Sequence, residues 1–131
     1  MKIYLASNYS THPLMREVAK GLKAHGHEIT GTWIEGTHDS WPAVDCAEVD
    51  LRDLDAADAI MLFSGNPARS RSRGGKNVEF GYALAKGKLL FLVGEPVNVF
   101  HYLPNVVRRA TWQDFVPVLK QHETYPDYFN A

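Results

Sequence analysis

Residues 59–93 read AIMLFSGNPARSRSRGGKNVEFGYALAKGKLLFLV, and this stretch decides the fold. It begins with an apolar run at 59–63 and ends with another at 89–93, and each run has the length of a buried strand. Between them lie a polar loop and a predicted helix at 76–86, which Gly87 closes. Two apolar strands joined through a helix are typical of parallel neighbours in one sheet.

The same alternation of strands and helices continues on both sides of this unit. We therefore expect an α/β fold: a single three-layer domain spanning residues 1–131, with a five-stranded, mainly parallel sheet that is doubly wound in the flavodoxin-like or Rossmann-like manner. The tail at 123–131 shows no clear pattern. The other expected elements are strands at 3–6, 28–33 and 106–110, a helix from His12 to Gly26, a long polar loop at 34–47, and helices at 50–57 and 112–122.

The composition is that of an ordinary globular protein. Apolar residues make up 45% and charged residues 22% of the chain, and the formal net charge is −1. This balance gives no sign of nucleic acid or a membrane surface as a partner. No apolar run approaches the roughly 20 residues that a membrane-spanning helix needs.

Cysteine and histidine usage narrows the setting further. Cys46 is the only cysteine, so no internal disulfide can form, and we expect a reduced, cytoplasmic location. His25 and His27 flank Gly26 without a third ligand nearby, which favours a solvated helix end over a metal site. We expect neither a metal nor a cofactor.

The loops at the carboxyl ends of the strands are the expected binding region. Ligands of open parallel sheets bind outside those ends. In this sequence the loops begin at Ser7, Ile34, Ser64 and Gly94, and they are also its polar, irregular segments.

Glu79 is the most informative residue in these loops and the helices that follow them. We place it in the first turn of the helix at 76–86, where the helix dipole favours a negative charge, and a carboxylate nucleophile must be ionised. Its neighbours are mostly apolar, so the carboxylate needs a pocket or a partner. Gly74, Gly75 and Gly81 would let a ligand approach closely. The plainer alternative is a glutamate that serves the dipole alone.

Asp50 is the second candidate, in a run of four aspartates ahead of the apolar strand. At the expected start of a helix it is either a functional carboxylate or an N-cap, and the two roles are compatible. We expect Asp53 and Asp55 to be solvated and Asp58 to end the helix.

The segment Arg69–Arg73 places three guanidinium groups and two serines on one loop. It could grip a phosphate or form a solvated loop. A P-loop is excluded, because Ser70 stands at the first glycine position and Asn77 at the Ser/Thr position. The absence of Gly-x-Gly-x-x-Gly leaves dinucleotide cofactors unsupported.

Four ordered segments together resemble the nucleoside 2-deoxyribosyltransferase family. They are Ile3–Ala6, Asp50 eight residues before Asp58, the run Gly75–Leu84 around Glu79, and Pro96–Phe100. The resemblance covers the chain from Lys2 to about Leu103, and the segment around Glu79 is the most specific.

The resemblance implies a reaction and a role for each segment. Glu79 would attack the anomeric carbon of a nucleoside, Asp50 would contact and protonate the departing base, and Tyr4 would reach the active site. Asn98 would be lent to a neighbouring subunit, so a homodimer or higher oligomer is implied. The implied partner is a small-molecule nucleoside or nucleotide. The binding residues expected on the loops are Ser7, Asn8, Ser64, Gly65, Arg71, Arg73, Gly75 and Asn98.

One departure from the family keeps two activities open. Transferases of the family often carry a further aspartate six residues before the nucleophile, where this chain has Arg73. Relatives that hydrolyse nucleoside 5′-monophosphates hold the phosphate on this loop, and Arg71 or Arg73 could do so here. We expect transfer of the deoxyribosyl group to another base, with 5′-monophosphate hydrolysis as the alternative.

Two readings from other classes remain at this point. The hydroxyl-rich turn at 7–11 could bind the phosphate of a flavin, although it lacks a glycine for close approach. A non-catalytic nucleotide sensor could use the same fold. Tyr9, Trp33 and Trp41 could stack on a base, but buried aromatic residues mostly belong to the core.

Overall fold

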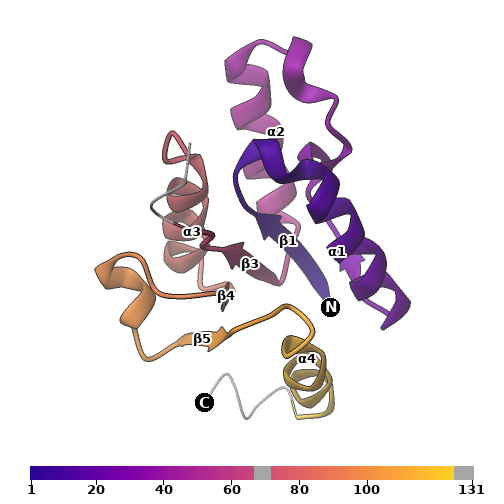
Figure 1. Cartoon of the computed structure of the whole chain (residues 1–131), viewed down its shortest axis with the longest axis vertical. Coiled ribbons are helices and arrows are strands. Elements are labelled where there is room, and N and C mark those ends of the chain that lie inside the picture. Colours follow the sequence, from indigo (N-terminus) through magenta and orange to yellow (C-terminus); the bar gives the residue numbers. More distant parts are fainter. Residues whose placement is uncertain (67–71, 126–131) are drawn as a thin grey trace.

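The protein forms a five-stranded, wholly parallel sheet with helices on both faces (Figure 1). The computed structural model describes residues 1–66 and 72–125. The strand order is β2-β1-β3-β4-β5, which confirms the expected doubly wound α/β fold. The strands are β1 (Lys2–Ala6), β2 (Glu28–Ile29), β3 (Ala59–Phe63), β4 (Leu89–Val93) and β5 (Val106–Arg109), and the helices are α1 (His12–Ala24), α2 (Ala43–Asp55), α3 (Gly75–Ala85) and α4 (Phe115–Thr124).

The central strands are buried on both faces, which explains their continuous apolar runs. Tyr4 of β1 is paired with Ile60 of β3, and the next residue, Leu5, points to the opposite face. Helix α3 covers the Tyr4 face, because the Tyr4 hydroxyl bonds to α3. On the other face Phe115 of α4 packs against Phe91 of β4, with ring centroids 5.1 Å apart.

Two boundaries differ from the sequence expectation. Strand β2 covers only Glu28–Ile29, because the chain turns at Gly31 into the 3-10 turn η2 (Thr32–Glu35). Helix α2 begins at Ala43, right after Pro42, and not near residue 50. The expected long loop at 34–47 is therefore largely ordered. It contains a second 3-10 turn, η3 (His38–Ser40).

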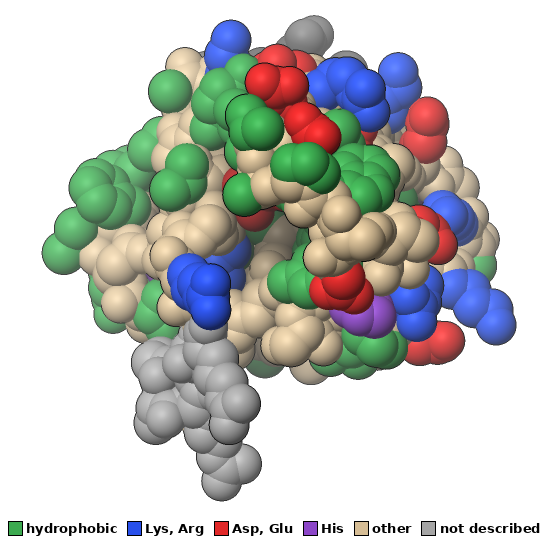
Figure 2. Space-filling view, turned by 90° about the horizontal axis from the view of Figure 1, so that it is seen from above, with side chains coloured by type: hydrophobic (Ala, Val, Ile, Leu, Met, Phe, Trp, Pro, Cys, Tyr) green, Lys and Arg blue, Asp and Glu red, His purple; other side chains and the backbone are tan. Residues whose placement is uncertain are grey.

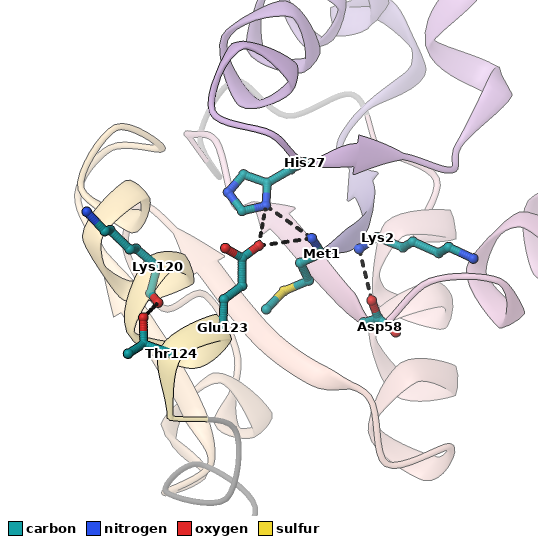
Figure 3. A network of polar contacts seen from close by, with 7 residues as sticks. All are labelled: Met1, Lys2, His27, Asp58, Lys120, Glu123 and Thr124. Atoms are coloured by element: carbon teal, nitrogen blue, oxygen red, sulfur yellow. Dashed lines mark hydrogen bonds and ion pairs between the residues drawn. The ribbon is translucent and has the colours of Figure 1, made fainter.

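The amino end of β1 is tied to α4 by a small polar cluster (Figure 3). The Met1 amino group donates to Glu123 at 3.2 Å and lies 3.3 Å from Nδ1 of His27. Burial lowers the pKa of His27, and the neighbouring amino group lowers it further. This cluster lies at the opposite end of β1 from the loops expected to bind ligands.

In the described ranges, 1–66 and 72–125, no helix is both long and apolar enough to cross a membrane. The same residues contain no group of three or more side chains arranged to hold a metal ion.

Candidate active site

Tyr4 and Glu79 meet in the space between the sheet and α3. The Tyr4 ring is completely buried in β1, and its hydroxyl donates a hydrogen bond to Oε2 of Glu79. Gly31 makes room for this ring, because a Cβ added there would lie 3.2 Å from it. An alanine at this position would push against the tyrosine that holds the carboxylate.

Glu79 lies one residue further along α3 than the sequence predicts, which moves it out of the first turn. The helix begins at Gly75, so Glu79 is in the second turn, and the first turn contains no acidic residue. The expected support from free backbone N–H groups falls off within the first turn, so the Tyr4 hydroxyl is the donor that replaces it. Burial raises the pKa of Glu79 to about 7, the Tyr4 hydrogen bond opposes that rise, and the charge of Asp50 adds to it.

Asp50 is in the middle of α2 and is not an N-cap, because the helix starts seven residues earlier. It is half-buried, and within the described part of the chain its Oδ1 is buried without a hydrogen-bond partner. Burial raises the pKa of Asp50 to about 6, with His38 opposing and Asp53 adding to the rise. The charge of Asp50 acts on both Tyr4 and Glu79, so the three groups belong to one site.

Two other aspartates hold α2, and therefore Asp50, in position. Asp53 is 8% exposed, contrary to the expectation that it is solvated. Its Oδ2 accepts hydrogen bonds from the backbone N–H and the hydroxyl of Thr32, at 3.0 and 2.9 Å. Asp55 accepts a hydrogen bond from the Tyr82 hydroxyl on α3 at 2.7 Å. These contacts fix α2 between η2 and α3.

The loop after β1 and the loop after β3 both reach this edge of the sheet. Ser7 accepts a hydrogen bond from the Thr11 hydroxyl at 2.8 Å, and Asn8 precedes the 3-10 turn η1 (Tyr9–Thr11). Ser64 is buried, and its hydroxyl donates to the backbone oxygen of Val93 at 3.3 Å. The Ser64 side chain is therefore used to join the ends of β3 and β4.

The glycines of these loops and Arg73 are more open. Gly65 has a positive φ of 67° and is exposed, and Gly75 begins α3 with open space beside its Cα. Arg73 is exposed. Arg71 lies outside the described residues.

Lys76 brings a buried positive charge to the start of α3. Its side chain is 7% exposed, and Nζ donates to the backbone oxygen of Ser64 at 3.0 Å. Burial lowers the pKa of this amine. No sequence motif predicts the hydrogen bond of Lys76 to the backbone oxygen of Ser64.

Asn98 is used locally in this structure. It caps the 3-10 turn η4 (Val99–Tyr102) by accepting a hydrogen bond from the Phe100 N–H at 3.0 Å, and its Nδ2 lies 3.3 Å from Nε2 of His101. It also lines a pocket of about 290 Å³ between α3 and η4. Gly81 also lines this pocket, so the space that its missing side chain leaves belongs to the pocket between α3 and η4 and not to the surroundings of Glu79.

Figure 2 looks at the molecule from the top of Figure 1, which is the side toward which β1 runs. Near the centre of this view the surface is hollowed. Acidic and basic side chains are partly visible inside the hollow (Figure 2). Of the aromatic residues considered for stacking, Trp33 belongs to the core, where its Nε1 donates to the backbone oxygen of Leu5 at 2.8 Å. Trp41 stacks on His38, a residue that the sequence analysis did not single out.

Two solved structures share this fold, although no protein-family model and no curated protein matches the chain. One is a 2-deoxyribosyltransferase from the psychrotolerant bacterium Bacillus psychrosaccharolyticus, with a TM-score of 0.68 and 21% sequence identity over 88% of this chain and 90% of that one. The other is a CMP N-glycosidase of Clostridium botulinum, with a TM-score of 0.59 and 19% identity over 92% of this chain and 99% of that one. At these identities the likeness establishes the fold.

Proposed function

We propose that the protein cleaves the N-glycosidic bond of a nucleoside or nucleotide through a covalent intermediate on Glu79, and that it transfers the deoxyribosyl group to another nucleobase. The observation that carries this proposal is the hydrogen bond of the buried Tyr4 to Glu79, with the half-buried Asp50 beside them, at the carboxyl ends of the strands. If the carboxylates of Glu79 and Asp50 only supported the fold, both would be expected to have hydrogen-bond partners within the protein. Here Oδ1 of Asp50 has no partner in the described part of the chain.

The chemistry divides between the two carboxyl groups. Ionised Glu79, held by the Tyr4 hydroxyl, attacks the anomeric carbon, and the C–N bond to the base breaks as the new C–O bond forms. Asp50 in its protonated form gives its proton to the departing base. A second base, or water, then gives a proton to the ionised Asp50 and attacks the same carbon, the C–O bond to Glu79 breaks, and the configuration is retained overall.

The fold neighbours support this proposal by their own activities. One is named as a 2-deoxyribosyltransferase and the other as a CMP N-glycosidase, so the same fold carries both transfer and hydrolysis. A shared fold does not set the activity, so the reaction proposed for this chain depends on its own site residues.

The test is an incubation with a panel of nucleosides and 5′-monophosphates, with and without a free acceptor base, followed by separation of the products. We expect base release and base exchange with the wild-type protein, and loss of both in Glu79→Gln. The matched control is Glu17→Gln, an exposed glutamate on α1, which should keep full activity. Release of free base without exchange would replace transfer by hydrolysis, and activity in Glu79→Gln would overturn the mechanism.

We further propose that the working unit is at least a dimer. Val78 on α3 and Val99, Phe100 and Tyr102 on η4 are 58–76% exposed in the single chain. Exposed apolar side chains gather at the left of Figure 2, the side on which η4 lies in Figure 1. An exposed apolar surface of this kind is typical of an interface between chains, and it adjoins Asn98.

A further inference from the structure

His38 is held in place by contacts with Trp41, Tyr9 and Cys46. Its ring stacks on Trp41, with centroids 4.1 Å apart and planes 18° from parallel. Its backbone N–H donates to the Tyr9 hydroxyl at 3.2 Å, and its backbone oxygen lies 3.7 Å from the Cys46 sulfur as acceptor. The residue is 6% exposed, so both its backbone and its ring are fixed.

One nitrogen of the His38 ring lacks a hydrogen-bond partner in the part of the chain that the structure describes. Nε2 of His38 is buried and makes no hydrogen bond to any residue that the structure describes. Oδ1 of Asp50 is in the same condition. Buried polar atoms are nearly always satisfied, so two such atoms on neighbouring segments point to a ligand that supplies the partners.

The two groups are neighbours across the start of α2. The sulfur of Cys46 lies 3.7 Å from the backbone oxygen of His38, and Asp50 follows Cys46 by one turn on the same side of α2. In keeping with this, a positive charge on His38 lowers the pKa of Asp50. Asp53 also acts on Asp50, but Oδ2 of Asp53 is already used by Thr32.

We propose, building on the function proposed above, that His38 reads the nucleobase beside Asp50. Nε2–H of His38 donates a hydrogen bond to a carbonyl oxygen of the base, next to the position at which Asp50 delivers its proton. No bond is made or broken at His38. An amino group in place of that carbonyl would bring its N–H donors against the Nε2–H donor of His38. The site would therefore prefer an oxo base over the corresponding amino base.

The matched substrates are the 6-oxo and 6-amino purine pair, 2′-deoxyinosine and 2′-deoxyadenosine, and the 4-oxo and 4-amino pyrimidine pair, 2′-deoxyuridine and 2′-deoxycytidine. We expect the wild-type protein to favour the oxo member of the pair that it cleaves faster by about tenfold in kcat/KM, the effect of one good hydrogen bond. His38→Phe keeps the stack on Trp41 but lacks the donor, and its ratio should fall to about one. His38→Gln, whose amide can donate again, should restore part of the preference.

The outcomes distinguish failure of the proposed role of His38 from failure of the proposed reaction. An unchanged ratio in His38→Phe, or a wild-type preference for the amino base, overturns the role of His38. If no substrate is cleaved, the proposed reaction fails, and the same ratios are then measured as dissociation constants by calorimetry. A ratio that depends on His38 in binding alone supports His38 as the base reader, and absence of binding overturns that as well. Thermal unfolding of each variant identifies any loss caused by misfolding.

Discussion

Glu79 and Asp50 each have a reason to hold a proton near neutral pH. Burial is the main cause for both, and it raises the pKa of Glu79 to about 7 and that of Asp50 to about 6. The reaction needs Glu79 ionised and Asp50 protonated. Because the pKa of Glu79 is the higher of the two, this is the less populated of the two singly protonated forms, and it is most abundant between about pH 6 and 7. The sequence could place Glu79 and Asp50 as candidates, but it could not predict their surroundings, because the Tyr4 hydroxyl and the α2 neighbours come from distant parts of the chain.

The first prediction concerns the pH dependence of activity. Below about pH 6 both carboxyl groups are protonated and no nucleophile is present, and above about pH 7 both are ionised and no acid is present. We expect kcat/KM, which reports the free enzyme, to follow a bell-shaped curve with its maximum between these values. Asp50→Asn should lower the rate and remove the alkaline limb. A flat profile from pH 5 to 8 would contradict the assignment of the two carboxyl groups.

The second prediction concerns stability, since a largely desolvated carboxylate such as that of Glu79 opposes folding. The folded-state pKa of Glu79 is raised, so the folded protein binds the proton more tightly than the unfolded chain. Stability therefore falls as pH rises from about 4.5 to about 7. Glu79→Gln should stabilise the protein by about 2 kcal/mol at pH 8 and by much less at pH 4.5. Urea unfolding at both pH values measures this, and equal stability of the two proteins at pH 8 would show that the carboxylate is well solvated.

Among the elements, α2 departs most from its sequence pattern and matters most for the site. The run Asp50–Asp58 predicts a helix start, solvated Asp53 and Asp55, and a helix end at Asp58, because charged residues are usually exposed. In the structure Asp55 is exposed and bonds to Tyr82 on α3, but Asp53 is buried against η2, and Asp58 accepts a hydrogen bond from the Lys2 N–H at 2.9 Å. Such contacts depend on tertiary packing, which a local pattern does not contain.

The strands were easier to predict. β1, β3 and β4 are apolar throughout because they are buried on both faces, and the parallel order follows from the helices between them. β2 was predicted too long because the alternation at 28–33 continues past Gly31, where the chain turns into η2. The turn places Gly31 against the Tyr4 ring, so the missed boundary is itself part of the site.

The third prediction tests the anchoring of α2. Asp53→Ala removes a carboxylate that accepts two hydrogen bonds from Thr32, and it should destabilise the protein by about 2–3 kcal/mol. It should also lower kcat/KM, because Asp50 lies on the helix that this contact anchors to η2. Glu48→Ala, at an exposed position of the same helix, should change neither quantity appreciably. An Asp53→Ala protein as stable and as active as the wild type would mean that α2 is held by other contacts.

At the scale of the whole molecule, the apolar surface on α3 and η4 remains uncovered in the single chain. Phe100 is 58% exposed and lies beside the pocket of about 290 Å³ that Asn98 also lines. The sequence indicated an oligomer only through its resemblance to the deoxyribosyltransferase family, and the structure adds the surface on which a second copy would bind. Whether the chain forms a single domain in isolation also stays a prediction.

The fourth prediction follows from that surface. Phe100→Asp should convert a dimer into a monomer, because a carboxylate cannot be buried in an apolar interface without a partner. Sedimentation velocity measures the change, and activity should fall with it. Leu14→Asp, at an apolar residue of α1 that is 60% exposed, is the matched control. A wild-type protein that sediments as an active monomer would contradict the proposed working unit.

The central claim is that Glu79 forms a covalent bond to the sugar. The most direct measurement uses a nucleoside with fluorine at the 2′ position, which slows turnover because it destabilises the cationic transition state of glycoside cleavage. After acid quench, intact-protein and peptide mass spectrometry should show one sugar added to the wild-type protein, on the peptide that contains Glu79, and no addition to Glu79→Gln. An adduct on any other residue, or release of the base without an adduct, would contradict the account.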